Sequence, residues 1–249
     1  MELSTDLLQH RPLKQEIFEA LHQRIIAGTY APGEWLRQEE IASQMGVSMT
    51  PVREALDLLV AAGLAERVPY RGVRVLELSQ EEIVEAYGMR LLLESAAARA
   101  AATHMKREQV QALSRIVEEM QSQVTLKDMS HARQLSRAFH QSIAEASGDG
   151  LLSKLYSIVA NSFPDWMLYE AMFHHPELLS ASLRCEQDEH RALVEALSNG
   201  DADAAAEKAR LHVLHLGKDL ETLLGIPGER LREQERQMLP LIQSTSEAK

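Results

Sequence analysis

The stretch "VSMTPVREAL", residues 47–56, predicts the beginning of a short helix that holds an arginine away from its apolar side. Ser48 is a residue type that caps a helix, and Pro51 falls in the first turn, where a missing N–H leaves no hydrogen bond unmade. Apolar residues then recur at helical spacing, and Gly63 offers a left-handed stop. Arg53 lies off the apolar stripe, so it is either a solvated charge or a side chain that meets a partner.

The residues around this helix predict a winged helix-turn-helix. An amphipathic helix closed by Gly28 and a short helix ending at Gly46 precede it. Two short helices joined by about three residues around a glycine form a helix-turn-helix, whose second helix enters the major groove of DNA. Valines then alternate on both sides of the turn "PYRG", residues 69–72, which predicts a small β-hairpin.

The composition indicates a chain with room for two domains. It has 249 residues, of which 45% are hydrophobic, enough for one large core or two modest ones. No stretch approaches the ~20 apolar residues of a membrane span, and the N-terminus lacks the pattern of a secretory signal, so we expect a cytoplasmic protein. The single cysteine, Cys185, excludes an internal disulfide, and we expect a buried, inert thiol.

The net charge of −11 is unusual for a protein that binds nucleic acid, but the charge is unevenly distributed. Residues 11–76 contain eight Lys or Arg and eight Asp or Glu, so their net charge is zero. The acidity therefore lies in the rest of the chain, and the front segment can still present a local basic face.

Beyond residue 78 the pattern changes to helices alone. Ser79 and Glu82 have the spacing of a capping box, after which a long helix extends to about His104. Further helical patterns cover residues 106–124, 130–147, 149–162, 165–173, 176–198 and 201–224. The fold class is therefore mainly α. The expected parts are a winged helix over 11–78, a bundle of six to seven helices over 79–224 and a charged tail over 225–249, with a short helix in its middle and a disordered end.

Two motifs in the front segment, "PG..L..EEIA..MGVS.T" and "PVREAL.LL...GL.ER...RG.RV", follow one another without a gap. They resemble the DNA-binding domain of the GntR family of bacterial transcription regulators over residues 11–78. The resemblance implies that the residues facing DNA are Arg37, Ser48, Met49, Thr50, Arg53, Arg71 and Gly72. These residue types suit the role, because arginine can pair with guanine, threonine can reach a phosphate or a thymine methyl, and glycine lets the backbone approach closely.

Met49 departs from that resemblance, because the family usually has arginine between the serine and the threonine of this motif. Methionine cannot make a bidentate contact to a base. The base that this position normally contacts is therefore either not recognised or recognised only through apolar contact. We therefore expect an operator that differs from the commonest half-site of the family.

Three histidines of the helical part, His140, His190 and His212, lie on different predicted helices. A single histidine on a helix is more often structural than a ligand, and these three form a site only if the bundle brings them together. The motifs "FH..I.EASG" and "EH..L.EAL..GD...A", with the histidine that follows, resemble the FCD type of GntR effector domain over about residues 79–224. The resemblance implies a divalent metal held by these histidines and an aspartate. Ser136 occupies the aspartate position.

The loss of that aspartate leaves two interpretations open. Three imidazoles still suit Zn²⁺ or Ni²⁺ and leave positions for a carboxylate or water, although the affinity for metal should fall while the pull on an anionic effector strengthens. The alternative is a metal-free pocket whose histidines bind an organic anion directly. His215, three residues beyond His212, is either a spare ligand or a surface histidine.

Arg90 and Glu94 lie one helical turn apart in the first long helix. The resemblance places an arginine and a glutamate here, with the arginine available to the effector or to bracing of the core. As a surface ion pair they would contribute only about 0.2–0.5 kcal/mol. The residues expected to bind the effector are Arg90, His140, His190 and His212.

The whole pattern predicts a DNA-binding transcription regulator that responds to a small organic acid. A homodimer on a palindromic operator is expected, because two-fold protein symmetry matches two half-sites. Release of DNA on effector binding, hence repression, is the commoner outcome in the family. The alternative is a mononuclear three-histidine metalloenzyme on a helical bundle, for which we find no convincing general base beside the histidines. We expect no enzyme activity and no membrane partner.

Overall fold

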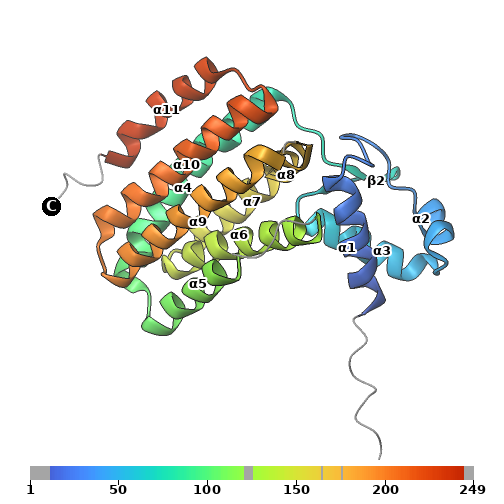
Figure 1. Ribbon diagram of the computed structural model, residues 1–249, viewed down its shortest axis with the longest axis horizontal. Coiled ribbons are helices and arrows are strands. Elements are labelled where there is room, and N and C mark those ends of the chain that lie inside the picture. The colour runs from blue at the N-terminus through green and yellow to red at the C-terminus, as the bar shows by residue number, and fades with distance from the viewer. Residues whose placement is uncertain (1–11, 121–125, 164, 175, 244–249) are drawn as a thin grey trace, which may run out of the picture. The chain divides into compact units, whose positions relative to one another are not determined.

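The computed structural model describes residues 12–120, 126–163, 165–174 and 176–243, and the chain divides into two compact units. The smaller unit ends at Glu77, and the larger begins at Leu78. Figure 1 shows that most of the described chain is helical, with one short pair of strands in the smaller unit. The predicted fold class, mainly helical with one hairpin, is confirmed.

The smaller unit is a winged helix. Its elements are α1 (Leu13–Ile26), α2 (Gln38–Met45), α3 (Met49–Ala61), β1 (Ala65–Val68) and β2 (Gly72–Val75). The strands pair antiparallel with Val68 opposite Gly72, so residues 69–71 form the turn of the wing. Backbone hydrogen bonds attach the segment before α2 to this hairpin: the Leu36 amide donates to the Val73 carbonyl at 2.9 Å, and the Val75 amide donates to the Glu34 carbonyl at 2.8 Å. Trp35 thereby lies opposite Arg74.

A tight turn connects α2 to α3. Gly46 ends α2 with a φ of 65°, a left-handed conformation that glycine adopts without strain. Ser48 occupies the N-cap position of α3, as predicted, but its side chain makes no capping hydrogen bond, so its predicted capping role is wrong. The reason is local: the third residue of α3 is Pro51, which lacks the N–H that a capping serine usually binds.

The larger unit is a bundle whose first helix contacts most of the others. Its helices are α4 (Gln80–His104), α5 (Arg107–Glu119), α6 (Leu126–Ala146), α7 (Gly150–Ser162), α8 (Asp165–His174), α9 (Pro176–Ser198), α10 (Ala202–Leu224) and α11 (Gly228–Gln243). Helix α4 contacts α6, α7, α9, α10 and α11. Small buried side chains such as Ala98 and Ala101 of α4 and Ala205 of α10 belong to one core and allow these helices to approach closely.

Helix α4 begins with the predicted capping box. The Glu82 amide donates to Ser79 Oγ at 3.2 Å, and the Ser79 amide donates to Glu82 Oε2 at 2.8 Å. The helix therefore starts directly after the boundary between the units and continues past Arg90 and Glu94.

The C-terminal segment is not the separate charged tail that the sequence suggests over 225–249. Most of it forms α11, longer than the short helix expected there, which packs on α4 within the same unit. Leu231 of α11 is 2% exposed, and Tyr87 of α4 donates a hydrogen bond to Glu235 at 2.7 Å. The apolar side chains that dock this helix are sparse among its charges, which conceals the packing face in the sequence. The predicted disordered end, 244–249, lies outside the described residues.

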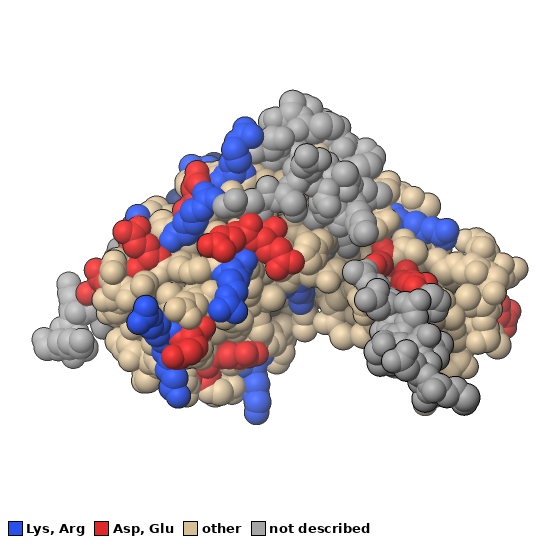
Figure 2. Space-filling view, turned by 60° about the horizontal axis from the view of Figure 1, so that its bottom comes forward, with Lys and Arg blue, Asp and Glu red and all other residues tan. Residues whose placement is uncertain are grey.

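Charge is interspersed over one face of the larger unit. On the face seen in Figure 2, Lys and Arg alternate with Asp and Glu over this unit without forming a continuous region of one sign. In the described part of the chain, no helix combines the length and the apolar character needed to cross a membrane.

Candidate functional site

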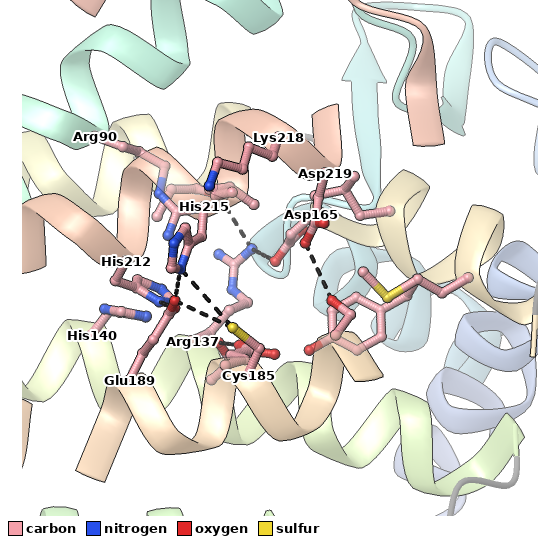
Figure 3. A pocket seen from close by; sticks show the side chains of 18 of the residues that line it. Arg90, Arg137, His140, Asp165, Cys185, Glu189, His212, His215, Lys218 and Asp219 are labelled. Carbon is pink, nitrogen blue, oxygen red and sulfur yellow. Dashed lines mark hydrogen bonds and ion pairs between the residues drawn. The ribbon is translucent and has the colours of Figure 1, made fainter. Parts of the chain in front are cut away.

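The helices of the larger unit enclose a cavity of about 300 Å³, at the lower end of the range for ligand pockets. Apolar and aromatic side chains share its wall with charged groups (Figure 3). Among the described residues, the cations of this wall are Arg90, Arg137 and Lys218, and the carboxylates are Asp165, Glu186, Glu189 and Asp219. Carboxylates outnumber these cations, so the charged groups of the wall are not mainly cationic.

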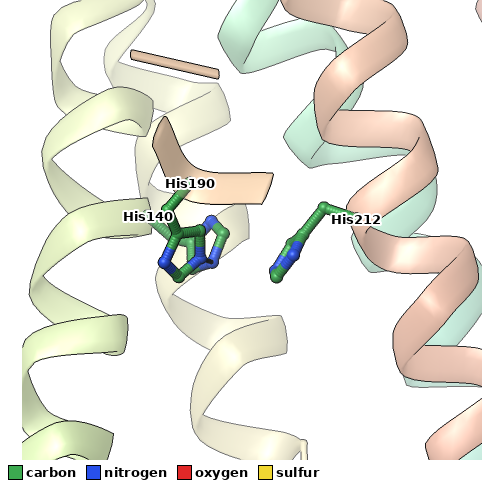
Figure 4. Close-up of side chains that lie close together, drawn as sticks. All are labelled: His140, His190 and His212. Carbon is green, nitrogen blue, oxygen red and sulfur yellow. Dashed lines mark hydrogen bonds between the residues drawn. The ribbon is translucent and has the colours of Figure 1, made fainter. Parts of the chain in front are cut away.

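Three histidines from different helices converge beside this cavity. His140 of α6, His190 of α9 and His212 of α10 point toward one another (Figure 4), and their candidate ligand atoms all lie within 4.8 Å of one another. The Nε2 atoms of His140 and His190 are 3.1 Å apart, and all three residues are buried. The structure therefore brings together the three histidines that the sequence proposes as metal ligands.

Two carboxylates hold the histidine rings in place. Glu94 Oε2 lies 3.2 Å from His140 Nδ1, and Glu189 Oε2 lies 2.7 Å from His212 Nδ1. Each contact occupies Nδ1 and leaves Nε2 available. Histidines that bind metals are typically oriented by such a carboxylate on their other ring nitrogen.

Burial controls the charge of this cluster. It lowers the pKa of each of the three histidines, which favours the neutral form that binds metals. Burial by itself would raise the pKa of Glu94, but the charge of Arg90 and then the interaction with His140, which includes a hydrogen bond, outweigh it and hold this pKa below its usual value. Glu94 therefore remains ionised beside His140.

The donor set fits a divalent ion of the zinc or nickel type. Two ligand atoms at about 2.0–2.1 Å from one ion lie roughly 3–3.5 Å apart, and the 3.1 Å between His140 Nε2 and His190 Nε2 falls in this range. Imidazole ligands suit Zn²⁺ and Ni²⁺, whereas Mg²⁺ and Ca²⁺ prefer oxygen ligands.

Ser136 stands where the resemblance implies an aspartate, and its hydroxyl donates to Glu186 Oε1 at 2.8 Å. Both residues line the cavity. A carboxylate is therefore present next to the missing aspartate, although it comes from α9 instead of α6. Glu186 does not belong to the group of described side chains that lie within ligand reach of the three histidines.

Arg90 is held on two sides inside the bundle. Its Nε donates to Glu94 Oε1 at 2.7 Å, and its guanidinium lies 4.6 Å from the centre of the Phe163 ring. Arg90 also lines the cavity. The residue therefore braces α4 and at the same time presents charge to the cavity wall.

The residues expected to meet DNA lie on the surface of the smaller unit. The exposed ones are Arg37, Ser48, Met49, Thr50, Arg53 and Arg71. Gly72 is half-buried and begins β2 with a φ of 115°, a conformation that other residues rarely adopt. At the tip of the wing, the fully exposed Tyr70 has a φ of 62°. The sequence pattern does not single out this tyrosine.

Trp35 links the wing to the start of α2. The guanidinium carbon of Arg37 lies 5.4 Å from the centre of the Trp35 ring, and that of Arg71 lies 5.7 Å from it. Two arginines from separate parts of the sequence thereby meet at one half-buried aromatic ring, at cation–π distance.

Ion pairing divides the arginines of this unit into two groups. Among the described residues, Arg37, Arg53 and Arg71 make no ion pair. The two other wing arginines differ, because Arg67 pairs with a carboxylate of α3 and Arg74 pairs with a carboxylate of β1. Exposed arginines without a carboxylate partner can bind phosphate or guanine.

Both units match known protein families. Residues 13–75 match "Bacterial regulatory proteins, gntR family", and residues 85–215, more than half of the chain, match "FCD domain". The chain belongs to the GntR family. It is therefore a DNA-binding transcription regulator with an FCD domain, as its motifs predict.

Relatives of this GntR regulator match it over most of their length. It is 29% identical over 215 residues to the "Probable D-xylose utilization operon transcriptional repressor" of Paenarthrobacter nicotinovorans. The aligned residues cover 86% of this chain and 91% of that relative. It is 26% identical over 227 residues to the "HTH-type transcriptional repressor RspR" of Escherichia coli (strain K12), with 90% and 95% covered. Its fold is similar to that of "E. coli McbR/YncC", with a TM-score of 0.59 at 21% identity over 83% of this chain and 96% of that one.

The metalloenzyme alternative is not supported, because these relatives are transcription regulators. The structure does place carboxylates beside two of the histidines, and the sequence pattern does not predict these contacts. Glu94 and Glu189 contact Nδ1 of their histidines, so they orient the rings instead of facing a bound substrate as a base would.

Cys185 of the GntR regulator is exposed, so the prediction of a buried thiol is wrong. It lines the cavity together with Glu189, one turn further along α9. The side of α9 that bears both residues faces the cavity instead of the core. The stretch "CEQDEH", in which Glu189 follows Cys185 by one turn and directly precedes His190, is the sequence signal that could have drawn attention to them.

Proposed function

We propose that the regulator is a repressor whose affinity for a palindromic operator falls when a small organic acid binds in the cavity of its FCD domain. One observation carries this function: three buried histidines converge beside a cavity large enough for a small ligand. Two relatives are named as repressors, which supports the direction of control. The cavity and the DNA-facing residues belong to different units, so the effector acts at a distance.

In this proposal His140, His190 and His212 hold a divalent ion, Zn²⁺ or Ni²⁺. The ion supplies positive charge and open coordination positions that a carboxylate of the effector can occupy. The composition of the cavity wall supports this role, because its carboxylates outnumber its cations and an anionic ligand needs added positive charge. Arg90 contributes a second positive group on the same wall.

DNA contact is assigned to the recognition helix, the N-cap of α2 and the wing, through Arg37, Ser48, Met49, Thr50, Arg53, Arg71 and Gly72. The exposure of Arg53 without an ion-pair partner among the described residues supports a base contact in the major groove. Arg37 and Arg71 share the ring of Trp35 and are placed to follow the backbone or the minor groove.

Helix α4 is the proposed connection between the two sites. It begins at the boundary between the units and carries Arg90, which lines the cavity, and Glu94, which contacts His140. An effector that favours one position of α4 over another also favours one arrangement of the DNA-binding units.

The regulator is proposed to act as a homodimer. Helix α7 exposes Leu151, Leu155 and Ile158, which are spaced so that they share one face. A row of exposed apolar side chains is typical of an interface, and a second copy is the partner that a palindromic operator requires. Leu155→Glu is expected to yield monomers in sedimentation analysis and to weaken operator binding; a dimer of unchanged stability would contradict this interface.

The metal part of the proposal is tested by elemental analysis of full-length protein purified without a polyhistidine tag or chelator. His140→Ala is expected to lose one zinc or nickel ion per chain relative to the wild type. His131→Ala is the matched control, because this exposed histidine contacts Glu119 outside the cavity. Equal metal content in all three proteins would refute metal binding by the three histidines.

The effector part is tested with DNA from the regulator's own promoter and a panel of small dicarboxylates and sugar acids. At least one acid should weaken operator binding by about 5- to 150-fold, the usual range for allosteric coupling. His212→Ala should bind the operator normally without this response. If no acid changes operator affinity in the wild type, organic-acid control is wrong.

A further inference from the structure

A second group of metal-ligating side chains lies on the wall of the cavity, separate from the three histidines. Cys185 and Glu189 of α9 are one helical turn apart, and His215 of α10 faces them (Figure 3). Their candidate ligand atoms lie within 4.8 Å of one another. The sulfur of Cys185 is 3.5 Å from Glu189 Oε1 and 4.0 Å from His215 Nδ1, and His215 Nδ1 also contacts Glu189 Oε1.

The donor types of this group define the ion it would take. A thiolate, an imidazole and a carboxylate together suit Zn²⁺ and related soft or borderline ions, whereas Mg²⁺ and Ca²⁺ would not select the thiolate. Cys185 is exposed and His215 is 44% exposed at its side chain, so an ion can reach them from solvent. Their exposure also leaves both side chains room to adjust to an ion.

Glu189 connects this group to the three histidines. Its Oε2 contacts His212 Nδ1 at 2.7 Å, while its Oε1 contacts His215. The carboxylate is 15% exposed at its side chain and is held from two sides. An ion bound through Oε1 would replace the contact with His215, while the contact of Oε2 with His212 keeps the carboxylate in place, and this pre-organisation favours binding.

We propose that Cys185, Glu189 and His215 form a second site for a thiophilic divalent cation, with an open coordination position toward the cavity. Binding releases the thiol proton of Cys185 to solvent, and the proton that His215 Nδ1 shares with Glu189 moves through solvent to Nε2. The thiolate, the imidazole Nδ1 and Glu189 Oε1 then each donate one electron pair to the ion. The site does not depend on an ion at His140, His190 and His212. The two sites use different oxygens of Glu189, because His212 contacts Oε2 and the proposed ion binds Oε1.

Cobalt(II) titration of the full chain tests the proposal, because a thiolate bound to Co²⁺ gives an intense ligand-to-metal charge-transfer band in the near ultraviolet. Cys185 is the single cysteine of the chain, so this band reports on one residue. The wild type is expected to develop the band, and His215→Ala is expected to lose it although the thiol is still present. His140→Ala is expected to keep it.

A second measurement uses the reactivity of the same thiol. Zn²⁺ should slow the reaction of Cys185 with a thiol reagent by at least about tenfold in the wild type, since the bound thiolate is no longer free to attack. The protection should disappear in His215→Ala and persist in the control His131→Ala. Circular dichroism establishes that each variant is folded.

Two outcomes would overturn the site. The first is the absence of a thiolate band in the wild type at saturating Co²⁺. The second is a band and a zinc protection that remain unchanged in His215→Ala, which would mean that the cysteine binds metal without the cluster. In a folded His140→Ala, retention of both signals is the expected result and supports a site that does not depend on the three histidines.

Discussion

The candidate site of the smaller unit is exposed, whereas that of the larger unit is buried. In the smaller unit, the residues proposed to face DNA are exposed except for the half-buried Gly72, and they come from one short part of the sequence, residues 37–72. In the larger unit, the three histidines and the Arg90–Glu94 pair are buried, and they come from helices spread over residues 80–224. Substitutions at the candidate DNA-binding residues of the winged helix should therefore cost little folding stability. In the bundle, the residues of the candidate site also contribute to stability, so substitutions there should affect both.

The largest expected effect tests this contrast in the bundle. Glu94→Gln leaves Arg90 buried without its counter-charge, and removal of one partner of a buried pair costs about 3–5 kcal/mol of unfolding free energy. Urea denaturation followed by circular dichroism measures it. Glu207→Gln is the control, because its partner Arg210 lies near the surface and the pair should contribute less than about 1 kcal/mol. Similar losses in both variants would remove the distinction between buried and exposed groups.

The next effect tests the other half of the contrast. Arg53→Ala should weaken operator binding by about 1–3 kcal/mol, or about 5- to 150-fold, because a base contact is lost. Its unfolding free energy should change by less than about 0.5 kcal/mol. Fluorescence anisotropy at fixed salt measures the binding. Arg74→Ala, which removes an arginine already paired with Glu66, should weaken binding less. Equal losses in the two variants would show that Arg53 has no special role.

Ser136→Asp introduces an aspartate at the position where the family resemblance implies one, and tests whether it strengthens metal binding in the bundle. The new aspartate should tighten zinc or nickel binding by at least about tenfold, since a carboxylate close to the ion is restored. It also lies beside Glu186, so the metal-free variant should melt at a lower temperature than the wild type. Calorimetric titration and thermal denaturation test both points. Ser136→Asn, similar in size and uncharged, should show neither change.

The smallest expected effect compares two helix caps, one in each unit. Ser48→Ala should change the unfolding free energy by less than about 0.5 kcal/mol, because the Ser48 side chain makes no capping hydrogen bond. Ser79→Ala should cost about 1 kcal/mol, because Ser79 accepts from the Glu82 amide. Urea denaturation compares them. A larger loss for Ser48→Ala than for Ser79→Ala would contradict the cap geometry.

The sequence predicts what depends on neighbouring residues. The capping box at Ser79, the left-handed stop at Gly63 and the antiparallel wing are set by local spacing, and all three appear in the structure. The three histidines illustrate the limit of this approach. Their helical positions are local, but their convergence depends on how α6, α9 and α10 pack, which only the family resemblance anticipates.

Contacts between distant residues account for what the sequence does not predict. The pairing of Glu189 with His212 and the meeting of Arg37 and Arg71 at Trp35 are set by packing between elements. The exposure of Cys185 has a similar origin, because an amphipathic pattern does not say which side of α9 borders a cavity. Docking of α11 was obscured because charged residues dominate its composition.

The position of Trp35 has an optical consequence. The chain has two tryptophans, and each unit contains one: Trp35 lies beneath the arginines at the wing, and Trp166 is fully buried in the bundle. Replacement of Trp166 by phenylalanine would leave an emission that comes from the wing alone. If operator binding draws Arg37 and Arg71 from the ring toward phosphates, as proposed, the fluorescence of Trp35 would change and would report DNA binding without an added label.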